Sequence, residues 1–206
     1  MSIQIRTIVC GDIQENAYLI YMEGRDDCVL VDPGDDYIKL KNALGPRRLA
    51  AILLTHGHFD HIMAVGELAR DTSASVYIAE EDIEILNDPR LNGLYSLMGR
   101  DDMPGPAIEA RPFGEKLSAA GMEFEVIPTP GHSRGSVCLR VTGEDLLFTG
   151  DTLFKAGFGR MDLYGGDQRA MILSLKKLLA LPPELKVYPG HGPSTTIGTE
   201  RSRYRL

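Results

Sequence analysis

Short apolar runs separated by turn residues fill the first part of the chain. Isoleucine, valine, leucine and tyrosine dominate residues 3–9, 17–22 and 28–31, and glycine and aspartate lie between these runs. Runs of this length and composition are typical of β-strands, and short connections between them favour antiparallel pairing. The pattern therefore predicts that antiparallel hairpins open the fold.

Helical spacing of apolar residues begins after the third strand ends at residues 31–34. Helices are predicted at 37–44, 62–70, 80–86 and 168–180, with Asp167 as the N-cap of the last one. Further strands are predicted at 50–54, 75–78, 123–127, 136–141, 145–149 and 186–188. Strands that alternate with helices indicate an α/β fold. Because no change of composition marks a boundary, we expect a single domain over residues 1–206.

Proline and glycine interrupt the stretch from Asn87 to Gly114, where the pattern predicts little regular structure. Long connections within a domain are usually functional, so we interpret this stretch as a lid or a partner-facing loop, with a plain surface excursion as the alternative. The stretch holds one apolar island, which is also a candidate contact in a homodimer. The island consists of Leu94, Tyr95, Leu97 and Met98.

Charge and cysteine content narrow the class of protein. The chain has 29 acidic against 22 basic residues and a net charge of −7, so nucleic acid is an unfavourable partner. The three cysteines form no C-x-x-C pair, which predicts buried free thiols in a reducing compartment. The start of the chain does not resemble a signal peptide, and no run of 18 apolar residues occurs. We therefore expect a cytoplasmic protein without a membrane span.

Three of the five histidines lie in one heptapeptide, Thr55-His56-Gly57-His58-Phe59-Asp60-His61, directly after the predicted buried strand at 50–54. His56 and His58 are two positions apart, so a loop backbone can direct both rings at one ion. Asp60 and His61 can face a second ion. Imidazole nitrogen and carboxylate oxygen suit zinc, manganese and iron, so the heptapeptide predicts a metal site. Polar loop histidines beside a strand are the alternative.

The remaining histidines, His132 and His191, each follow a Pro-Gly pair, and all five histidines lie in loops after predicted strands. Asp32 and Asp151 also lie directly after predicted strands. If these strands run the same way in neighbouring sheets, their ends meet at one edge and bring distant residues together. The histidines, Asp60 and Asp151 together are more ligands than one ion needs. They divide into three ligands for each of two ions and one carboxylate that bridges the ions. The candidate ligands are His56, His58, Asp60, His61, His132, Asp151 and His191.

Taken in order, segment 56–61 followed by His132, Asp151 and His191, with Asp32 upstream, resembles the metallo-β-lactamase superfamily. The resemblance spans nearly the whole chain and implies a four-layer αββα sandwich. It also implies that one metal ion is bound by His56, His58 and His132, the other by Asp60, His61 and His191, and both by Asp151. Asp32 matches the family's strand-end aspartate, which orients the ligand loops.

Asp151-Thr152-Leu153-Phe154 and Gly157-Phe158-Gly159-Arg160 are similar to the glyoxalase II branch, the hydroxyacylglutathione hydrolases. The stretch 192–198 is similar to short bacterial members of this branch. The resemblance implies that Arg160 contacts the glutathione part of the substrate, and Phe158 is a second candidate for the substrate pocket. True β-lactamases are disfavoured, because their pattern does not usually offer aspartate at the bridging position. Long members carry a C-terminal helical region that completes the glutathione site, whereas this chain continues 15 residues beyond His191. We expect the 87–114 stretch or a second subunit to replace that region.

The leading functional hypothesis is hydrolysis of a small thioester, such as S-lactoylglutathione, by a hydroxide that bridges two divalent ions, with zinc favoured over iron or manganese. Asp60 is expected to steer the water and accept its proton. A thiol has a pKa of about 8.5, so a thiolate can leave without a separate acid to protonate it. The alternative is a persulfide dioxygenase, which the same segment 56–61 and the loop Gly159-Arg160-Met161-Asp162 also resemble. That resemblance implies one iron held by His56 or His58, His132 and Asp151. A lactone or phosphodiester hydrolase is a further alternative on the same ligands.

Overall fold

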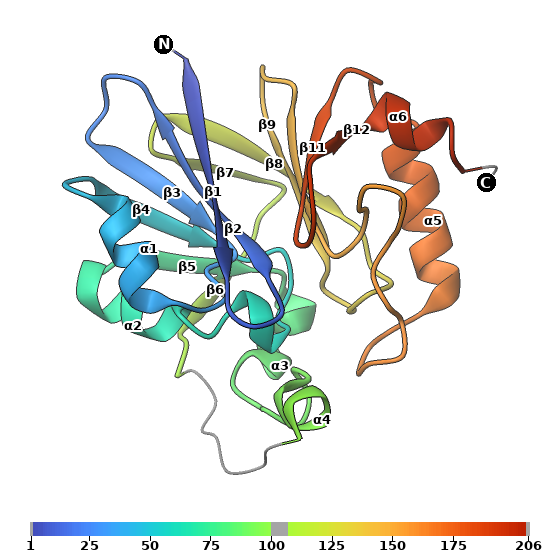
Figure 1. The fold of residues 1–206 in the computed structure, drawn as a ribbon, viewed down its shortest axis with the longest axis horizontal. Coiled ribbons are helices and arrows are strands. Elements are labelled where there is room, and N and C mark those ends of the chain that lie inside the picture. The colour runs from blue at the N-terminus through green and yellow to red at the C-terminus, as the bar shows by residue number, and fades with distance from the viewer. Residues whose placement is uncertain (1, 100–106, 205–206) are drawn as a thin grey trace.

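Two mixed β-sheets face each other, and helices cover their outer faces (Figure 1). The computed structural model describes residues 2–99 and 107–204. Blue to green strands form the N-terminal sheet, and yellow to red strands form the C-terminal sheet. This architecture is the αββα sandwich that the sequence predicts.

Each sheet contains six strands. From one edge to the other, the N-terminal sheet consists of β1 (Ile3–Cys10), β2 (Glu15–Met22), β3 (Asp27–Val31), β4 (Arg48–Leu53), β5 (Ser75–Ile78) and β6 (Ala110–Pro112). In the same sense, the C-terminal sheet consists of β12 (Thr195–Thr196), β11 (Lys186–Pro189), β10 (Leu146–Gly150), β9 (Val137–Val141), β8 (Met122–Pro128) and β7 (Lys116–Ala119). The α-helices are α1 (Tyr37–Leu44), α2 (Val65–Thr72), α3 (Ile83–Leu86), α4 (Leu94–Met98), α5 (Gln168–Leu179) and α6 (Ile197–Arg201), and the 3₁₀ turns are η1 (Phe59–His61) and η2 (Glu80–Asp82).

Three apolar clusters hold these layers together. Helices α1 and α2 pack on the outer face of the N-terminal sheet, and α5 packs on the outer face of the C-terminal sheet. Because both faces of the central strands are covered, β3 is apolar on both sides. Cys28 and Leu30 face the helices, whereas Val29 and Val31 face the other sheet. Burial contributes about 1.5–3 kcal/mol for each large aliphatic side chain of this kind.

Helix α5 forms where local sequence and packing agree. Asp167 Oδ1 accepts a hydrogen bond from Ala170 N (2.8 Å), which confirms the predicted N-cap. Such a cap stabilises a helix by about 1 kcal/mol. Met171, Leu175 and Leu178, spaced three or four positions apart, form the buried stripe that packs on β10 and β11. The helix therefore lies flat against the C-terminal sheet.

Strand directions bring the candidate residues to one edge of the sandwich. Strands β3, β4 and β5 are parallel neighbours, so their C-terminal ends lie at the same edge. In the other sheet β10 and β11 are parallel, and β8 runs the same way because β8 and β10 are both antiparallel to β9. The predicted convergence of strand ends is confirmed, and it places the loops that follow these strands side by side.

Most described residues of 87–114 lie outside helices and strands, as predicted, and two short elements interrupt the stretch. The apolar island forms helix α4, bracketed by Gly93 and Gly99 at positive φ, and β6 adds an edge strand. Leu94 is buried, so packing stabilises a helix too short to persist alone. Residues 100–106 of this stretch lie outside the described residues.

Several short elements differ from the sequence-based expectation. The predicted helix at 62–70 begins at Val65, because 59–61 form the turn η1, and the one at 80–86 divides into η2 and α3. Strands β7 and β12 and helix α6 have no counterpart among the predicted elements, since two to five residues carry little periodic signal. The cysteines are free and buried, as predicted. Among the described residues, no helix is both long and apolar enough to cross a membrane.

Candidate metal centre

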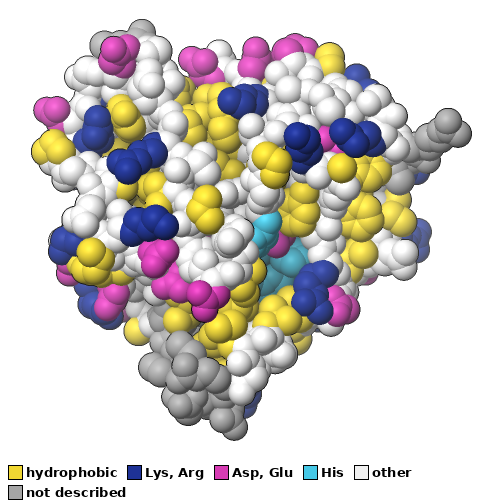
Figure 2. All heavy atoms as spheres, viewed as in Figure 1, with side chains coloured by type: hydrophobic (Ala, Val, Ile, Leu, Met, Phe, Trp, Pro, Cys, Tyr) yellow, Lys and Arg dark blue, Asp and Glu magenta, His cyan; other side chains and the backbone are white. Residues whose placement is uncertain are grey.

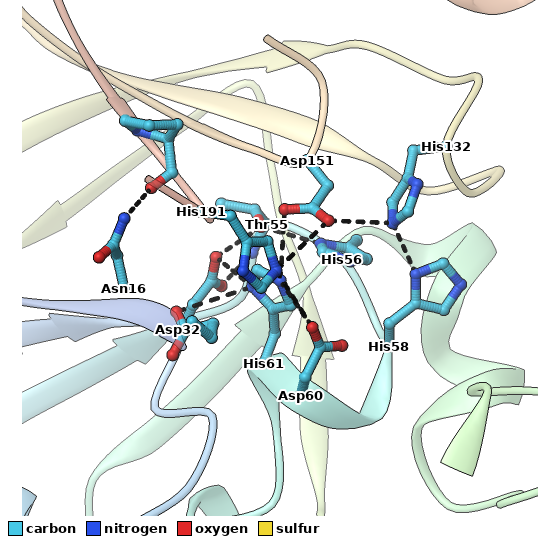
Figure 3. A network of polar contacts seen from close by, with 12 residues as sticks. Asn16, Asp32, Thr55, His56, His58, Asp60, His61, His132, Asp151 and His191 are labelled. Atoms are coloured by element: carbon cyan, nitrogen blue, oxygen red, sulfur yellow. Dashed lines mark hydrogen bonds and ion pairs between the residues drawn. The ribbon is translucent and has the colours of Figure 1, made fainter. Parts of the chain in front are cut away.

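All the predicted ligands meet between the two sheets, at the edge where the strands end (Figure 3). They arrive on four connections, after β4, β8, β10 and β11. Asp32, at the end of β3, lies behind them. The residues form two groups of three with Asp151 between them.

His56, His58 and His132 form the first group. Their ligand nitrogens lie within 4.8 Å of one another, and His58 Nδ1 is 2.7 Å from His132 Nε2. Burial, reinforced by the charges of neighbouring histidines, lowers the pKa of His58 to about 3 and holds the pKa of His56 well below its usual range. Both imidazoles are therefore neutral, which is the form that binds a metal ion.

Asp60, His61 and His191 form the second group, again with ligand atoms within 4.8 Å of one another. Asp60 Oδ2 lies 3.2 Å from His191 Nε2 and 3.8 Å from His61 Nε2. The His61 side chain is fully buried, whereas those of His191 and Asp60 are 23% and 15% exposed. This group therefore opens to solvent on the side of His191 and Asp60.

Asp151 lies between the two groups. Its Oδ1 is 3.4 Å from His61 Nε2, and its Oδ2 is 3.5 Å from His132 Nε2 and 3.7 Å from His191 Nε2. Burial opposes the charge on Asp151, but the nearby charge of His61 outweighs it and holds the pKa of the carboxyl below its usual range. An ionised carboxylate with one oxygen toward His61 and the other toward His132 and His191 is suited to bridging two cations.

Unpaired buried atoms show that this donor set fits metal ions. Among the described residues, His56 Nε2, His61 Nε2 and Asp151 Oδ1 are buried and have no hydrogen-bond partner. Leaving such a group unpaired costs about 1–3 kcal/mol, and a divalent cation would satisfy all three atoms, in exchange for a proton at His61. Nitrogen and carboxylate donors suit zinc, iron and manganese alike. Three residues plus the shared carboxylate would give each ion four protein ligands, and water would take a fifth position.

Asp32 and Thr55 fix the orientation of two histidine rings. Thr55 Oγ1 donates to Asp32 Oδ2 (2.6 Å), so it can only accept from His56 Nδ1 (3.1 Å), and His56 Nε2 keeps its lone pair for the centre. Asp32 Oδ2 also accepts from His61 Nδ1 (3.1 Å), and Asp32 Oδ1 accepts from Thr55 N (2.7 Å). These contacts are the ones that the predicted orienting role of Asp32 requires.

Arg160 reaches the site through its backbone. Its carbonyl oxygen accepts a hydrogen bond from His132 Nδ1 (2.7 Å), which directs His132 Nε2 toward the other ligands. Its guanidinium donates twice to Asp162 (2.7 Å each) at the surface, so its charge is already paired. Phe158 is 42% exposed, and its ring lies 6.3 Å from that of Tyr204. Substrate contact by Arg160 or Phe158 stays a prediction.

Glu15 is a buried carboxylate at the centre that is not among the predicted ligands, because it does not follow a predicted strand. Its side chain is 1% exposed, its Oε1 lies 3.8 Å from His61 Nδ1, and neither oxygen has a hydrogen-bond partner among the described residues. Burial raises the pKa of Glu15 well above its usual range. The residue begins β2 instead of following a strand. Because β2 is antiparallel to β3, its start lies beside the end of β3, so hairpin pairing is the signal that would have found it.

The start of β2 also secures the loop that carries His191. Asn16 Nδ2 donates to Pro189 O (3.0 Å, Figure 3) and to Gly192 O (2.8 Å). Tyr18 Oη donates to Pro189 O (2.6 Å). These bonds join the N-terminal sheet to a loop of the C-terminal sheet, so they fix His191 relative to Asp60 and His61.

The mouth of the site is partly apolar. In Figure 2 the histidines lie in a hollow, with hydrophobic side chains on part of its border and basic and acidic side chains on another part. A pocket of about 50 Å³ beside Asp60 is lined in part by Ile13, Met63 and Met98. Ile13 and Met98 are 41% and 38% exposed, so helix α4 presents an apolar side chain to this pocket.

The family model of the Metallo-beta-lactamase superfamily matches residues 10–191, a span that includes every predicted ligand. The chain belongs to the metallo-β-lactamase superfamily. Within the superfamily, "Probable metallo-hydrolase YqgX" of Bacillus subtilis is 38% identical over 201 residues, which cover 96% of this chain and 94% of that protein. The hydroxyacylglutathione hydrolase GloC of Haemophilus influenzae is 31% identical, with 98% and 95% covered.

Solved structures of superfamily members agree closely with this fold. The crystal structure of BLEG-1 B3 metallo-beta-lactamase has a TM-score of 0.87 and 40% identity, and the match covers 97% of each chain. The crystal structure of TTHA1623 in a di-iron-bound form has a TM-score of 0.83 and 40% identity, with 95% of this chain and 96% of that chain covered. The αββα architecture is therefore that of the superfamily.

Removal of metal is expected to destabilise this superfamily member, because the neutral histidines and unpaired lone pairs then lack their cations. At a free metal concentration about a thousandfold above the dissociation constant, binding contributes about 4 kcal/mol to stability. For a chain of this size, that contribution corresponds to a decrease in Tm of roughly 8–16 °C on chelation. Differential scanning calorimetry before chelation, after it and after restoring zinc measures the effect. An unchanged Tm after verified metal removal would contradict it.

Proposed function

We propose that the protein is a dinuclear metal-dependent hydrolase that cleaves small thioesters. The observation that carries the proposal is the position of Asp151, whose two oxygens face different neighbours in the two groups of ligands. A site for a single ion would need only one of these groups. When bound, two zinc, iron or manganese ions would lower the pKa of water toward neutrality and polarise a substrate carbonyl.

Asp60 is the candidate for proton transfer. Its carboxylate is partly exposed on the open side of the centre, beside the small apolar pocket. From there it can orient a water molecule and accept a proton from it. All five histidines of the chain lie in the cluster, so none is free to protonate a leaving group. A thiol has a pKa of about 8.5, so a thiolate leaves without such an acid. The site therefore favours a thioester substrate over an amide.

The mouth of the site favours a small substrate with an apolar part. Ile13 and Met98 line the pocket beside Asp60, and the Arg160 guanidinium is paired with Asp162. The similarity to GloC supports a hydroxyacyl thioester such as S-lactoylglutathione. These apolar side chains lead us to expect that uncharged thioesters of similar acyl size are also cleaved.

Hydrolysis of β-lactams is a second candidate activity, favoured by the 40% identity to BLEG-1 over nearly the whole chain. A persulfide dioxygenase needs one iron with two histidines and one carboxylate. The second complete group around Asp60 is more than that chemistry requires. A dinuclear hydrolase therefore accounts for more of the site.

A comparison of substrates at each metal loading tests these assignments. Protein loaded with zinc, iron or manganese is assayed with S-lactoylglutathione, an uncharged acyl thioester, a chromogenic cephalosporin and glutathione persulfide, the last by oxygen uptake. We expect thioester turnover to require metal and to exceed β-lactam turnover, with no oxygen consumed. If only the cephalosporin is hydrolysed, or oxygen is consumed with one iron per chain, the thioesterase proposal is wrong.

A further inference from the structure

Asp82 is a buried carboxylate that joins two of the ligand loops. It is the last residue of η2, follows strand β5, and is 1% exposed. Its Oδ2 accepts hydrogen bonds from Gly57 N (3.0 Å) and Ser133 Oγ (2.6 Å). Its Oδ1 accepts a hydrogen bond from Gly135 N (2.6 Å). One side chain thus satisfies three donors from two separate loops.

These two loops carry the whole first group of ligands. Gly57 lies between His56 and His58, and Ser133 directly follows His132. The loop with Gly57 follows β4 of the N-terminal sheet, whereas the loop with Ser133 follows β8 of the C-terminal sheet. Asp82 therefore links the two sheets at the point where the nitrogens of His58 and His132 approach within 2.7 Å.

The fit around Asp82 is close on both sides. A Cβ atom at Gly135 would lie 2.7 Å from Asp82 Cγ, and one at Gly57 would lie 2.7 Å from Ile85 Cγ1. Carbon atoms do not normally approach this closely, so both positions require glycine for the backbone to reach the carboxylate. Hydrogen bonds to an ionised acceptor belong to the stronger class. The spacing of the two loops therefore depends on the Asp82 side chain.

The second group is positioned by other contacts. His61 is held by Asp32, and the loop with His191 is held by Asn16 and Tyr18. Among the described residues, no hydrogen bond joins Asp82 to Asp60, His61 or His191. Loss of Asp82 should therefore act on one group of ligands more than on the other.

We propose that Asp82 is a positioning residue for one of the two metal ions. By fixing the 56–58 loop relative to the 132–135 loop, it sets the affinity for the ion held by His56, His58 and His132. The affinity for the ion at Asp60, His61 and His191 does not depend on it. This inference rests on the two-metal site of the proposed function, and it concerns metal binding, which can be measured without any substrate.

Metal titration of Asp82 variants tests the proposal. Metal-free wild-type and Asp82→Ala proteins are titrated with Zn²⁺ against a chromophoric chelator. Replacing residues that orient metal ligands typically weakens binding about 10–100-fold, so we expect a loss of that size for one of the two ions and a change below about threefold for the other. Titration with Co²⁺ should show the first equivalent of metal entering the site of unchanged affinity, with its own absorption spectrum.

Two further variants test whether partial loss of the Asp82 hydrogen bonds also weakens metal binding. Asp82→Asn retains the shape, but its amide nitrogen faces backbone N–H groups that also donate, so we expect a loss in the same direction. Ser133→Ala removes one of the three hydrogen bonds and should give a smaller loss for the same ion. Asp27→Asn is the control, because Asp27 forms its ion pairs with Arg25 and Arg48 at the opposite end of β3. Its two affinities should equal those of the wild type.

The outcomes separate this inference from the proposed function. If the wild type binds a single ion per chain, the two-metal proposal itself is wrong. If the wild type binds two ions and Asp82→Ala binds both as the wild type does, only the role of Asp82 is overturned. Equal loss of both ions in folded protein also overturns it. If Asp82→Ala does not fold, the metal affinities of Ser133→Ala and Asp82→Asn test the proposal instead. Wild-type affinities in both variants would show that Asp82 is not a positioning residue.

Discussion

Replacing Asp151 with alanine is expected to lower hydrolysis by about a thousandfold or more. Asp151 lies between the two groups, with its oxygens 3.4 Å from His61 Nε2 and 3.5 Å from His132 Nε2. Its loss would remove one ligand from each ion and the negative charge that holds two cations together. Several kcal/mol of transition-state stabilisation depend on such ions, and each 1.36 kcal/mol corresponds to about tenfold in rate. Turnover of a small thioester measures the loss, and metal analysis measures occupancy.

Asp145→Ala is the matched control for Asp151→Ala. Asp145 is an exposed aspartate just before β10, whereas Asp151 directly follows the same strand. Circular dichroism should show that both variants fold, since neither aspartate belongs to the apolar clusters that hold the layers together. Full activity of Asp151→Ala, with two ions still bound, would contradict the bridging role. Equal losses in both variants would indicate a general effect on the fold.

Replacing Asp32 with asparagine is expected to weaken metal binding and activity by about 10–100-fold, the range typical of residues that orient metal ligands. Asp32 accepts hydrogen bonds from Thr55 N, Thr55 Oγ1 and His61 Nδ1. An asparagine amide can accept only through its oxygen, so its nitrogen faces a donor and at least one bond is lost. A buried donor left without an acceptor costs about 1–3 kcal/mol. Chelator competition measures the affinity, and urea unfolding of the metal-free protein measures the stability.

Asp35→Asn provides the comparison for Asp32→Asn. Asp35 lies on the same connection but is exposed, and its Oδ1 accepts a hydrogen bond from the adjacent Asp36 N. Its substitution should leave metal affinity within about twofold of the wild type, as is usual for surface positions away from such features. Wild-type metal affinity in Asp32→Asn would show that Thr55 and the loop backbone orient His56 and His61 without the carboxylate.

Much of the metal centre follows from residue order alone. The H-x-H-x-D-H segment, the two Pro-Gly-His tripeptides and two aspartates after strands predict the ligand set, because every apolar run before them is a recognisable strand. Parallel strands share an edge, so the residues after them converge. The αββα architecture and superfamily membership follow from the same ordered motifs. These predictions concern long, buried elements, where both faces of a strand are covered and the apolar signal is strong.

Other contributors to the site carry no comparable signal. Glu15 begins a strand, so it reaches the edge only through antiparallel pairing of β2 with β3. Asp82 lies in a run of acidic residues, Glu80-Glu81-Asp82, that reads as a solvated surface, and only the packing of η2 against the ligand loops distinguishes it from its exposed neighbours. The role of Arg160 is carried by its carbonyl oxygen, which is the same in every residue type.

The sequence by itself therefore determined the candidate ligands, their order and the layers that support them, because these depend on residue type and on apolar periodicity. Only the tertiary structure decided that Glu15 and Asp82 lie beside the ligand loops, that the Arg160 side chain is paired with Asp162, and that α4 contributes Met98 to the pocket beside Asp60. Those features depend on distances between atoms that are far apart in the chain. Such distances are set by how the two sheets pack, which periodicity along one strand or helix does not record.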